Sequence, residues 1–303
     1  MKKQPVIFNS LSQLHKAMGL PAPLHPLISI INYGEAEFDP DDLEGGIILN
    51  FYKISFKTKF SGKLKYGQGF YDFEEGGMSF VAPGQLLRMQ EEEANYDGMS
   101  LHIHPDLLRS YALDSQIKQY GFFSYSAAEA LYLSEKEKTT ILSIYLFIQD
   151  ELKERIDKFS QDVIISQIEL LLNYANRFYD RQFITRKAVN NDLLSKLENQ
   201  LETYFRENKA AMKGLPSVNI IAESLNVTPR YLSDLLRNLI GLNTQQFIHE
   251  KVIEKAKEYL AKDEMTTAEI AFHLGFEHPQ SFNKLFKSKT NLSPSDYKKS
   301  LLN

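Results

Sequence analysis

The sequence predicts an α+β protein of two domains, with strands confined to the N-terminal part and an all-helical C-terminal part. Three observations lead to this prediction. Apolar and polar residues alternate over residues 52–57, which is the period of a half-buried strand. Apolar stripes with helical spacing follow between residues 135 and 180. From about residue 192 onward, helical patterns are separated only by short breaks, so no strand is expected there.

Up to about residue 105 the pattern predicts short strands joined by tight turns. Residues 52–57 and 78–81 are the clearest strands, and turn signals stand at residues 61–63, 66–69 and 74–77. Residues 66–69 hold too few glycines for a phosphate-binding loop, so a hairpin turn is expected there. The three glutamates at 91–93 are expected in a solvated loop. Short strands with closely spaced turns are typical of an antiparallel barrel or sandwich.

Residues 106–185 are expected to be helical and to form an antiparallel hairpin. Ser134 and Glu137 have the spacing of a capping box ahead of the apolar run from Ile141 to Leu152. Ser160 precedes a second helix. Its apolar stripe consists of Ile164, Ile168, Leu171, Leu172, Ala175 and Tyr179. Either the β domain or a second copy of the chain could cover this stripe, and the sequence leaves both open.

The boundary between the two domains is expected after residue 185. Residues 181–191 are polar and basic, which predicts a linker. The N-terminal domain would then span residues 1–185 and the C-terminal domain residues 186–303.

Composition and charge narrow the class of protein. The chain has 303 residues and no cysteine, which excludes disulfides, cysteine-ligated zinc, iron–sulfur clusters and thiol catalysis. No signal-peptide or membrane-spanning pattern is recognised, so a soluble, cytoplasmic protein without membrane contact is expected. The formal net charge is −4, but residues 190–303 hold 15 Lys and Arg against 14 Asp and Glu. Residues 282–303 hold five lysines against Asp296 alone, so an acidic body ends in a basic segment.

An internal repeat between residues 221 and 297 carries most of the information about function. Ile221-Ala222 recurs 49 residues later as Ile270-Ala271, and after the turn the offset becomes 50. The other matched pairs are Leu225 with Leu274, Asn226 with Gly275, Val227 with Phe276, Leu232 with Phe282, Leu236 with Phe286, Arg237 with Lys287, Gly241 with Asn291, and Phe247 with Tyr297. Each copy is predicted to be a short helix, a tight turn, a longer helix and a closing aromatic residue.

The residue types in the repeat suit two steeply crossing helices joined by a turn. Each copy has a small residue where the helices cross, and a residue in the turn that tolerates a left-handed backbone. A capping residue or a proline then starts the second helix. In the two copies these residues are Ala222, Asn226 and Thr228-Pro229, and Ala271, Gly275 and Pro279.

The second helix of each copy is expected to keep one face free for DNA. The candidate DNA-binding residues are Arg230, Ser233, Asp234 and Arg237 in the first copy, and His278, Gln280, Asn283, Lys284 and Lys287 in the second. Arg and Gln side chains hydrogen-bond to base edges, and Lys side chains bind phosphates. Two helical hairpins in an ordinary bundle would be the alternative, and the matched turns of the two copies disfavour it.

A set of motifs in the second copy is specific. It consists of Glu269-Ile270-Ala271-x-x-Leu274-Gly275-Phe276, Phe282-x-x-x-Phe286-Lys287 and Leu292-Ser293-Pro294-x-x-Tyr297. With this set, residues 218–298 resemble the DNA-binding domain of the AraC/XylS family of transcription regulators. Three positions depart from the family's pattern. Asn291 stands where glycine is usual, Lys284 where arginine is frequent, and Asp234 where a base-reading arginine is common.

The resemblance implies a transcription regulator that places two recognition helices in successive major-groove segments of double-stranded DNA. It also implies a cupin-like N-terminal barrel for sensing and dimerisation, a small-molecule effector, and RNA polymerase as a further partner. If a second copy rather than the β domain covers the apolar stripe, a homodimer would form through the helices of residues 135–180. Two alternatives stay open: the cupin-like domain is a metal enzyme, or the regulator has no small-molecule effector and responds to its own abundance or to a protein partner.

His102 and His104 form the strongest candidate for a metal site. Two residues apart on a strand, they would share one face. A metal needs further ligands, and the other histidines (His15, His25, His249, His273 and His278) show no suitable cluster. We therefore expect the strand to end at His104-Pro105, both imidazoles to be hydrogen-bonded, and no metal to bind. No nucleophile-elbow motif is found, so no catalytic residue and no cofactor are predicted, and the effector-binding residues stay unassigned.

Overall fold

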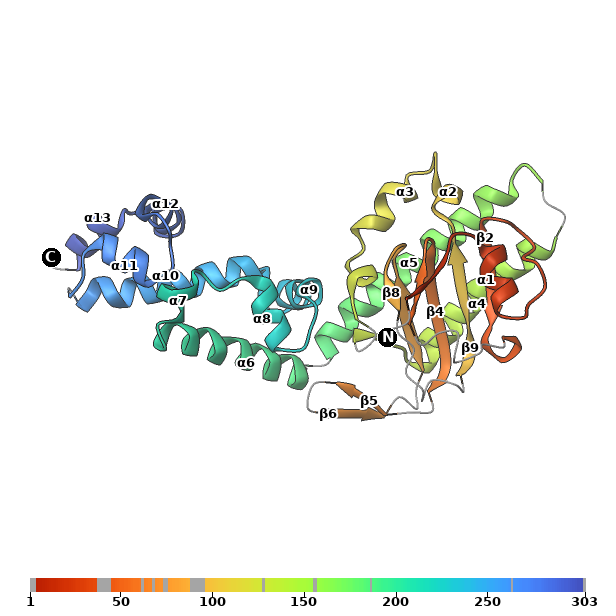
Figure 1. Ribbon diagram of the computed structural model, residues 1–303, viewed down its shortest axis with the longest axis horizontal. Helices are drawn as coiled ribbons and strands as arrows, with labels where there is room; N and C mark the ends of the chain where they lie inside the picture. Colours follow the sequence, from red (N-terminus) through yellow and green to blue (C-terminus); the bar gives the residue numbers. More distant parts are fainter. Residues whose placement is uncertain are drawn as a thin grey trace. The chain divides into compact units, whose positions relative to one another are not determined.

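The computed structural model describes residues 4–36, 45–60, 63–66, 69–72, 76–87, 96–126, 129–154, 157–185, 187–262 and 264–301 (Figure 1). The chain divides into two compact units, residues 1–182 and residues 183–303. The first unit combines sheets with helices, and every regular element described in the second unit is a helix. The predicted α+β class is therefore confirmed.

The strands of the first unit form three sheets. Their bounds are β1 Val6–Phe8, β2 Ile28–Asn32, β3 Ile47–Leu49, β4 Tyr52–Phe60, β5 Lys63–Tyr66, β6 Gly69–Asp72, β7 Gly77–Val81, β8 Leu86–Leu87, β9 Tyr96–Ile103 and β10 Leu131–Tyr132. The largest sheet has the order β10-β7-β4-β9-β2 and antiparallel pairing throughout. A second sheet has the order β1-β3-β8, and β5 pairs with β6. The strands predicted at residues 52–57 and 78–81 lie in β4 and β7.

The predicted barrel is not closed. Within the described residues, the largest sheet ends at β10 on one side and at β2 on the other. The pair β1–β3 is parallel, and the connection between them contains the helix α1, Leu11–Ala17, in a region that was predicted to hold strands alone. Ser10 starts this helix by accepting a hydrogen bond from the backbone N–H of Gln13. Alternation within a strand shows which residues share a face, but it does not show which strand lies beside it, so it could not distinguish a barrel from separate sheets.

The turn signals of the first unit fall wholly or partly outside the described residues. This holds for residues 61–63, 66–69 and 74–77, and for the glutamates at 91–93. Their predicted conformations therefore stay predictions. Four short helical segments follow β9 in the described residues. They are α2 Pro105–Leu108, α3 Leu113–Gln116 and the 3₁₀ segments Ile117–Gln119 and Gly121–Ser124.

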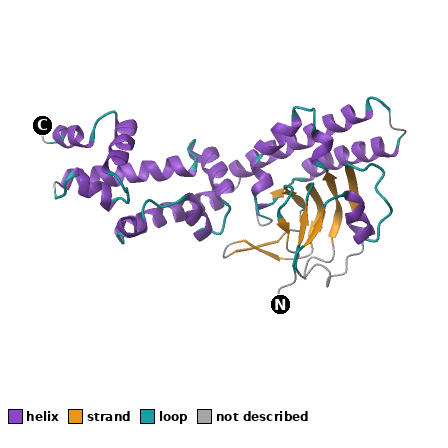
Figure 2. Cartoon of the chain, turned by 45° about the horizontal axis from the view of Figure 1, so that its top comes forward, coloured by secondary structure: helices purple, strands orange, loops and turns teal. Residues whose placement is uncertain are grey.

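Two long helices, α4 Glu135–Lys153 and α5 Ser160–Thr185, cover one face of the largest sheet (Figure 2). The predicted capping box is present: Ser134 accepts from the backbone N–H of Glu137, whose carboxylate accepts from the N–H of Ser134 at 2.8 Å. The hydroxyl of Tyr145 donates to the carbonyl oxygen of Ile54 at 2.8 Å and so joins α4 to β4. The whole stripe predicted on α5 is buried within the chain. The stripe therefore belongs to the core of this unit, and the alternative that a second copy covers it is wrong.

The predicted linker is also wrong. Residues 181–185 complete α5, and α6 begins at Lys187. The guanidinium of Arg181 donates to both carboxylate oxygens of Glu137 at 3.1 and 2.7 Å, and the buried Gln182 bonds to the backbone of Tyr132 and Ala130. These polar side chains are held by partners 44 to 52 residues away, which local polarity cannot reveal.

The second unit contains eight helices in its described residues. Their bounds are α6 Lys187–Arg206, α7 Lys209–Lys213, α8 Val218–Ser224, α9 Pro229–Ile240, α10 Thr244–Lys262, α11 Thr267–His273, α12 Pro279–Thr290 and α13 Pro294–Ser300. The copies of the repeat are α8 with α9 and α11 with α12. Their turn residues Asn226 and Gly275 have φ values of 55° and 91°, as their types predicted. No described helix of either unit is long and apolar enough to cross a membrane.

The buried hydrogen bond of Tyr145 gives a test of the packing of α4 on the sheet. We expect Tyr145→Phe to lower the free energy of unfolding by about 1–2 kcal/mol, because the carbonyl of Ile54 then loses a buried donor. Tyr111→Phe is the matched control, since its hydroxyl bonds Asp162 in an exposed position and its loss should change stability by less than about 0.5 kcal/mol. Urea unfolding of both variants measures the difference, and equal effects would contradict this assignment.

Candidate nucleic-acid interface

Helix α9 has one buried and one exposed face. Tyr231, Leu232, Leu235 and Leu236 are buried, and they fix the rotation of the helix about its axis. Thr228 starts the helix by accepting from the backbone N–H of Tyr231, and Pro229 occupies the first turn. The predicted residues Arg230 and Arg237 are exposed on the other side.

The two arginines of α9 share one carboxylate. Asp234 receives Nε of Arg230 at 3.0 Å on one oxygen and Nη1 of Arg237 at 2.8 Å on the other. The side chain of Asp234 is only 17% exposed, whereas the arginine side chains are 45% and 48% exposed. The carboxylate therefore offsets part of their charge and orients both guanidinium groups.

Ser233 does not lie on the free face of α9. It is half-buried, and its hydroxyl lies 2.9 Å from the hydroxyl of Thr244, which is fully buried at the start of α10. Ser233 therefore lies at the edge of the face that α10 covers, and its predicted DNA contact stays a prediction. Helical spacing places Ser233 next to the exposed face of α9. The sequence could not show that α10 covers this edge of the helix.

Helix α12 offers an exposed polar face. Phe282 and Phe286 are fully buried and hold the opposite side of the helix. The exposed residues are Gln280, Asn283, Lys284 and Lys287, whose spacing places them on one face. In the described part of the chain, neither Lys284 nor Lys287 forms an ion pair. His278 is exposed at the N-cap position, and its side chain makes no capping hydrogen bond.

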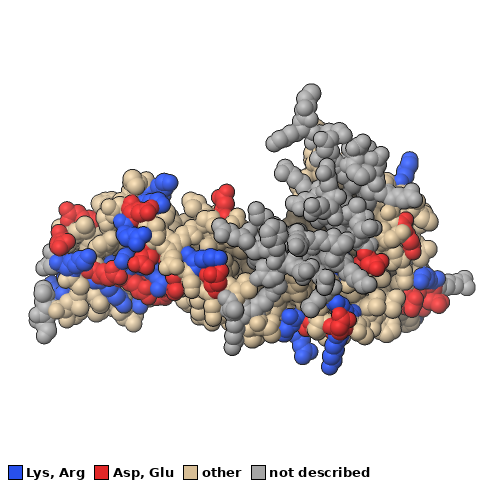
Figure 3. Space-filling view, turned by 90° about the horizontal axis from the view of Figure 1, so that it is seen from below, with Lys and Arg blue, Asp and Glu red and all other residues tan. Residues whose placement is uncertain are grey.

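Charges of both signs are mixed over the second unit on the face shown in Figure 3. Several cations of the second unit are paired. Lys289, on α12, donates to Glu250 of α10 at 2.8 Å, and Lys255 donates to Glu258 at 2.7 Å. The basic C-terminal segment seen in the sequence is therefore partly compensated, and Lys284 and Lys287 differ from Lys289 in lacking such a partner among the described residues.

The turn before α12 lies against the end of α7. A Cβ atom on Gly275 would come within 2.6 Å of the carbonyl carbon of Gly214, 2.7 Å of the N of Leu215 and 2.8 Å of the carbonyl oxygen of Ala210. Tyr204 of α6 holds the same segment, because its hydroxyl donates to the carbonyl oxygen of Gly214 at 3.0 Å. The repeat identified Gly275 as a turn residue, but no pattern in the sequence linked it to α7.

The two histidines considered for a metal are engaged separately. His102 is buried on β9, and its Nε2 lies 2.8 Å from the hydroxyl of Ser100. The strand ends at Ile103, and Nδ1 of His104 accepts from the backbone N–H of Asp106 at the start of α2. The predicted strand end and hydrogen bonds are confirmed. The described residues contain no group of three or more His, Asp or Glu side chains with the geometry to hold a metal ion.

Comparison with known proteins places the second unit among DNA-binding domains. Residues 221–300 match a family model described as a helix-turn-helix domain. The chain is 22% identical over 284 residues to the Msm operon regulatory protein of Streptococcus mutans, covering 91% of this chain and 94% of that protein. It is 27% identical over 138 residues to the HTH-type transcriptional activator RhaS of Salmonella paratyphi B, covering 45% of each chain.

A solved structure also matches the C-terminal part. It is the C-terminal domain of the two-component response regulator yesN from Fusobacterium nucleatum. The sequence identity is 25% and the TM-score is 0.31, and the match covers 35% of this chain and 98% of that one.

The close approach at Gly275 predicts an unequal effect of two glycine substitutions. Gly275→Ala should cost about 3 kcal/mol or more, because a positive φ is combined with collisions against backbone atoms. Gly241→Ala, at a φ of +75° with nothing within 4 Å, should cost only about 1 kcal/mol. Thermal or urea unfolding of the two variants tests this, and a Gly275→Ala variant as stable as Gly241→Ala would show that the two segments are not in contact.

Proposed function

Residues 221–300 form an AraC-type helix-turn-helix domain of a DNA-binding transcription regulator, and on this premise we propose that α9 and α12 enter successive major-groove segments of one DNA site. The resemblance to the AraC/XylS family that the sequence indicated is confirmed for this domain. The proposal goes further in treating α8–α9 and α11–α12 as two helix-turn-helix motifs. The observation that carries it is the exposed face of α12, whose polar residues suit DNA and are not used inside the described part of the domain.

The two helices would contribute unequally to recognition. On α12, the amide of Gln280 near the start of the helix suits base edges, and Lys287 two turns later suits a phosphate. Asn283 and Lys284 lie between them on the same face. On α9, Arg230 and Arg237 would approach DNA already paired with Asp234, so part of their charge is cancelled before contact. We assign secondary DNA contacts to His278, which lies beside Gln280, and to Ser233, which lies at the covered edge of α9.

The arrangement predicts a bipartite DNA site for one monomer. The exposed residues of α9 and α12 differ, so each helix should bind a different half-site, with centres about 34 Å apart along the DNA. Hydroxyl-radical footprinting of the full chain on a site selected from random DNA should show two protected major-groove segments per monomer. A single short protected segment would contradict the use of both helices.

Two residues of α12 should contribute differently: Gln280 to the choice of DNA sequence and Lys287 to the affinity for any DNA. Gln280→Ala should weaken binding to the preferred site by about 1–3 kcal/mol and leave mismatched sites nearly unchanged, because one base contact is lost. Lys287→Ala should weaken all sites alike and reduce the slope of log K against log salt by about one unit, because one fewer counterion is released. Fluorescence anisotropy titrations at several salt concentrations measure both.

Lys289→Ala is the matched control for this experiment. It removes a cation from the same helix, but one already paired with Glu250, so the salt slope should change less than in Lys287→Ala. If Gln280→Ala kept full discrimination while Lys287→Ala changed it, the assigned rotation of α12 would be wrong.

We also propose that the first unit binds a small hydroxyl-rich molecule on the polar face of its largest sheet. Ser29, His102 and Lys53 lie directly opposite one another across β2, β9 and β4. The next row on the same face consists of serines. Ser100 and Ser55 lie two residues from His102 and Lys53 on the same strands, and Ser79 of β7 lies opposite Ser55. The residues between them, such as Ile54 and Leu101, face α4 and α5 and are fully buried.

The polar face is enclosed, and part of its hydrogen-bonding capacity is unused. Ser29, Ser55, Ser100 and His102 are each at most 5% exposed. The Nδ1 atom of His102 is buried without a hydrogen-bond partner in the described part of the chain. Burial, followed by the charges of Lys53 and His15, holds the pKa of His102 well below its usual range, so this imidazole is neutral at neutral pH. Neutral donors and acceptors of this kind suit hydroxyl groups.

A ligand on this face should depend on Lys53. In a thermal-unfolding screen with monosaccharides and polyols, we expect at least one compound to stabilise the wild-type chain. Lys53→Gln should abolish this stabilisation, whereas Lys16→Gln, an exposed change of equal charge on α1, should preserve it. No stabilising compound would instead favour a regulator without a small-molecule effector, and equal stabilisation of the two variants would contradict a site that uses Lys53.

A homodimer through the helices of residues 135–180 remains part of the proposal, but not through the buried stripe. Their outward apolar residues are Leu146, Phe147, Val163 and Leu170, each at least 41% exposed. RNA polymerase stays a proposed partner with no surface assigned to it.

A further inference from the structure

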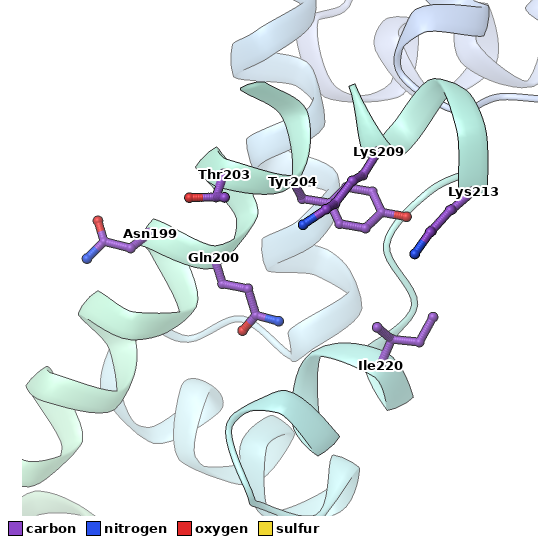
Figure 4. A pocket seen from close by; sticks show the side chains of 7 residues that line it. All are labelled: Asn199, Gln200, Thr203, Tyr204, Lys209, Lys213 and Ile220. Atoms are coloured by element: carbon purple, nitrogen blue, oxygen red, sulfur yellow. The ribbon is translucent and has the colours of Figure 1, made fainter. Parts of the chain in front are cut away.

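The second unit contains a pocket that no part of the proposed DNA contact uses. It lies among α6, α7 and α8 and has a volume of about 430 Å³, within the usual range for small-molecule sites (Figure 4). Its lining residues are Asn199, Gln200, Thr203, Tyr204, Lys209, Lys213 and Ile220. None of them belongs to α9 or α12, so a ligand held here would leave the candidate DNA-binding residues exposed.

The lining combines two cations with an apolar surface. Lys209 and Lys213 of α7 extend toward the opening between α7 and α6, and Ile220 of α8 faces them from the other side (Figure 4). Lys209 is paired with Glu207 at 2.6 Å, whereas Lys213 makes no ion pair within the described part of the chain. The ring of Tyr204 lies beside Lys209. One ammonium group is thus available next to an aromatic ring and an exposed aliphatic side chain.

We propose that this pocket binds a small organic anion, with a phosphate or carboxylate group held mainly by Lys213, while Lys209, already paired with Glu207, contributes less. A charge-assisted hydrogen bond from the ammonium group of Lys213 suits such an anion, and Tyr204 and Ile220 suit a compact apolar body attached to it. Asn199 and Thr203 on α6 provide further polar groups at the edge. Inorganic phosphate alone would use only the cations, so it should bind more weakly than an anion that carries a ring.

The pocket is connected to the turn that positions α12. Tyr204 lines the pocket and also donates its hydroxyl to the carbonyl of Gly214. The backbone of Gly214 in turn lies against Gly275, at the distances given above. A ligand that changes the position of Tyr204 or α7 therefore changes the surface on which the turn before α12 rests. We infer that the anion regulates DNA binding through α12, and this second step rests on the proposed function.

Binding of the anion is tested on the full chain by isothermal titration calorimetry with phenyl phosphate and with inorganic phosphate. Phenyl phosphate should bind saturably, and Lys213→Gln should weaken it about tenfold. Lys196→Gln is the matched control: it removes a cation from α6 that is paired with Asp192 outside the pocket, and should leave the affinity unchanged. No saturable binding, or equal weakening by both variants, would overturn the proposal.

A separate measurement distinguishes a small anion from DNA itself. If Lys213 contacts DNA phosphate instead, Lys213→Gln will weaken DNA binding without ligand, and saturating DNA will exclude phenyl phosphate completely rather than change its affinity by a finite factor; either result overturns the small-anion site. If the site regulates, saturating phenyl phosphate will change DNA affinity of the wild type at least threefold. Tyr204→Phe should retain ligand binding, because the ring remains, but lose this change, because the bond to Gly214 is gone.

The calorimetric and DNA arms fail separately. If the wild-type chain does not bind DNA even without phenyl phosphate, the proposed function is contradicted and the calorimetric result on the pocket still stands. Ligand binding with unaltered DNA affinity would overturn the regulatory step alone.

Discussion

The second unit depends on one close approach, that of Gly275 to the backbone at the end of α7. Three backbone atoms lie within 2.8 Å of the place where a Cβ atom would stand, so only glycine fits. The equivalent position in the first copy is Asn226, which is exposed and has a similar left-handed backbone. Asparagine is sufficient there because the turn needs only the backbone conformation. The two copies therefore share a fold but differ in what their turns support: the second turn lies against the end of α7, whereas the first copy is joined to α6 by a hydrogen bond from Gln200 to Ser224.

The same asymmetry extends to the charges of the two candidate recognition helices. On α9, Asp234 forms ion pairs with Arg230 and Arg237 of the same helix. These pairs limit the movement of both arginine side chains and reduce their attraction to DNA phosphates. On α12, Lys284 and Lys287 have no such partner in the described residues, whereas Lys289 is paired with Glu250 of α10. Non-specific attraction to DNA should therefore come mainly from α12. A preoriented guanidinium loses less conformational entropy on binding, so α9 is better suited to a few directed contacts than to general affinity.

The parts of the structure that local patterns determine were predictable from the sequence. The capping box at Ser134, the stripe on α5 and the left-handed turns of the repeat each depend on residues within a few positions of one another. Features set by distant partners were not predictable. Arg181 and Gln182 were assigned to a linker because their partners lie far along the chain, and Ser233 was assigned to a free face because its partner Thr244 belongs to the next helix. The pocket on α6 has no motif, since its lining residues come from three separate helices.

The two proposed ligand sites require different chemistry, and burial is the reason. On the sheet face, serines and a neutral His102 are almost fully removed from water, so a ligand anion held beside them would have to lose its hydration. A neutral molecule with hydroxyl groups can bond the unpartnered Nδ1 of His102 at a lower cost, although Ser29, Ser55 and Ser100 already bond His15, Tyr33 and His102. The pocket on α6 and α7 lies at the surface, where Lys213 is exposed and an anion keeps part of its hydration. Charge is tolerated there but also screened, so selectivity must come from Tyr204 and Ile220. A regulator with both sites could therefore respond to a neutral compound in one unit and to an anion in the other, without competition between them.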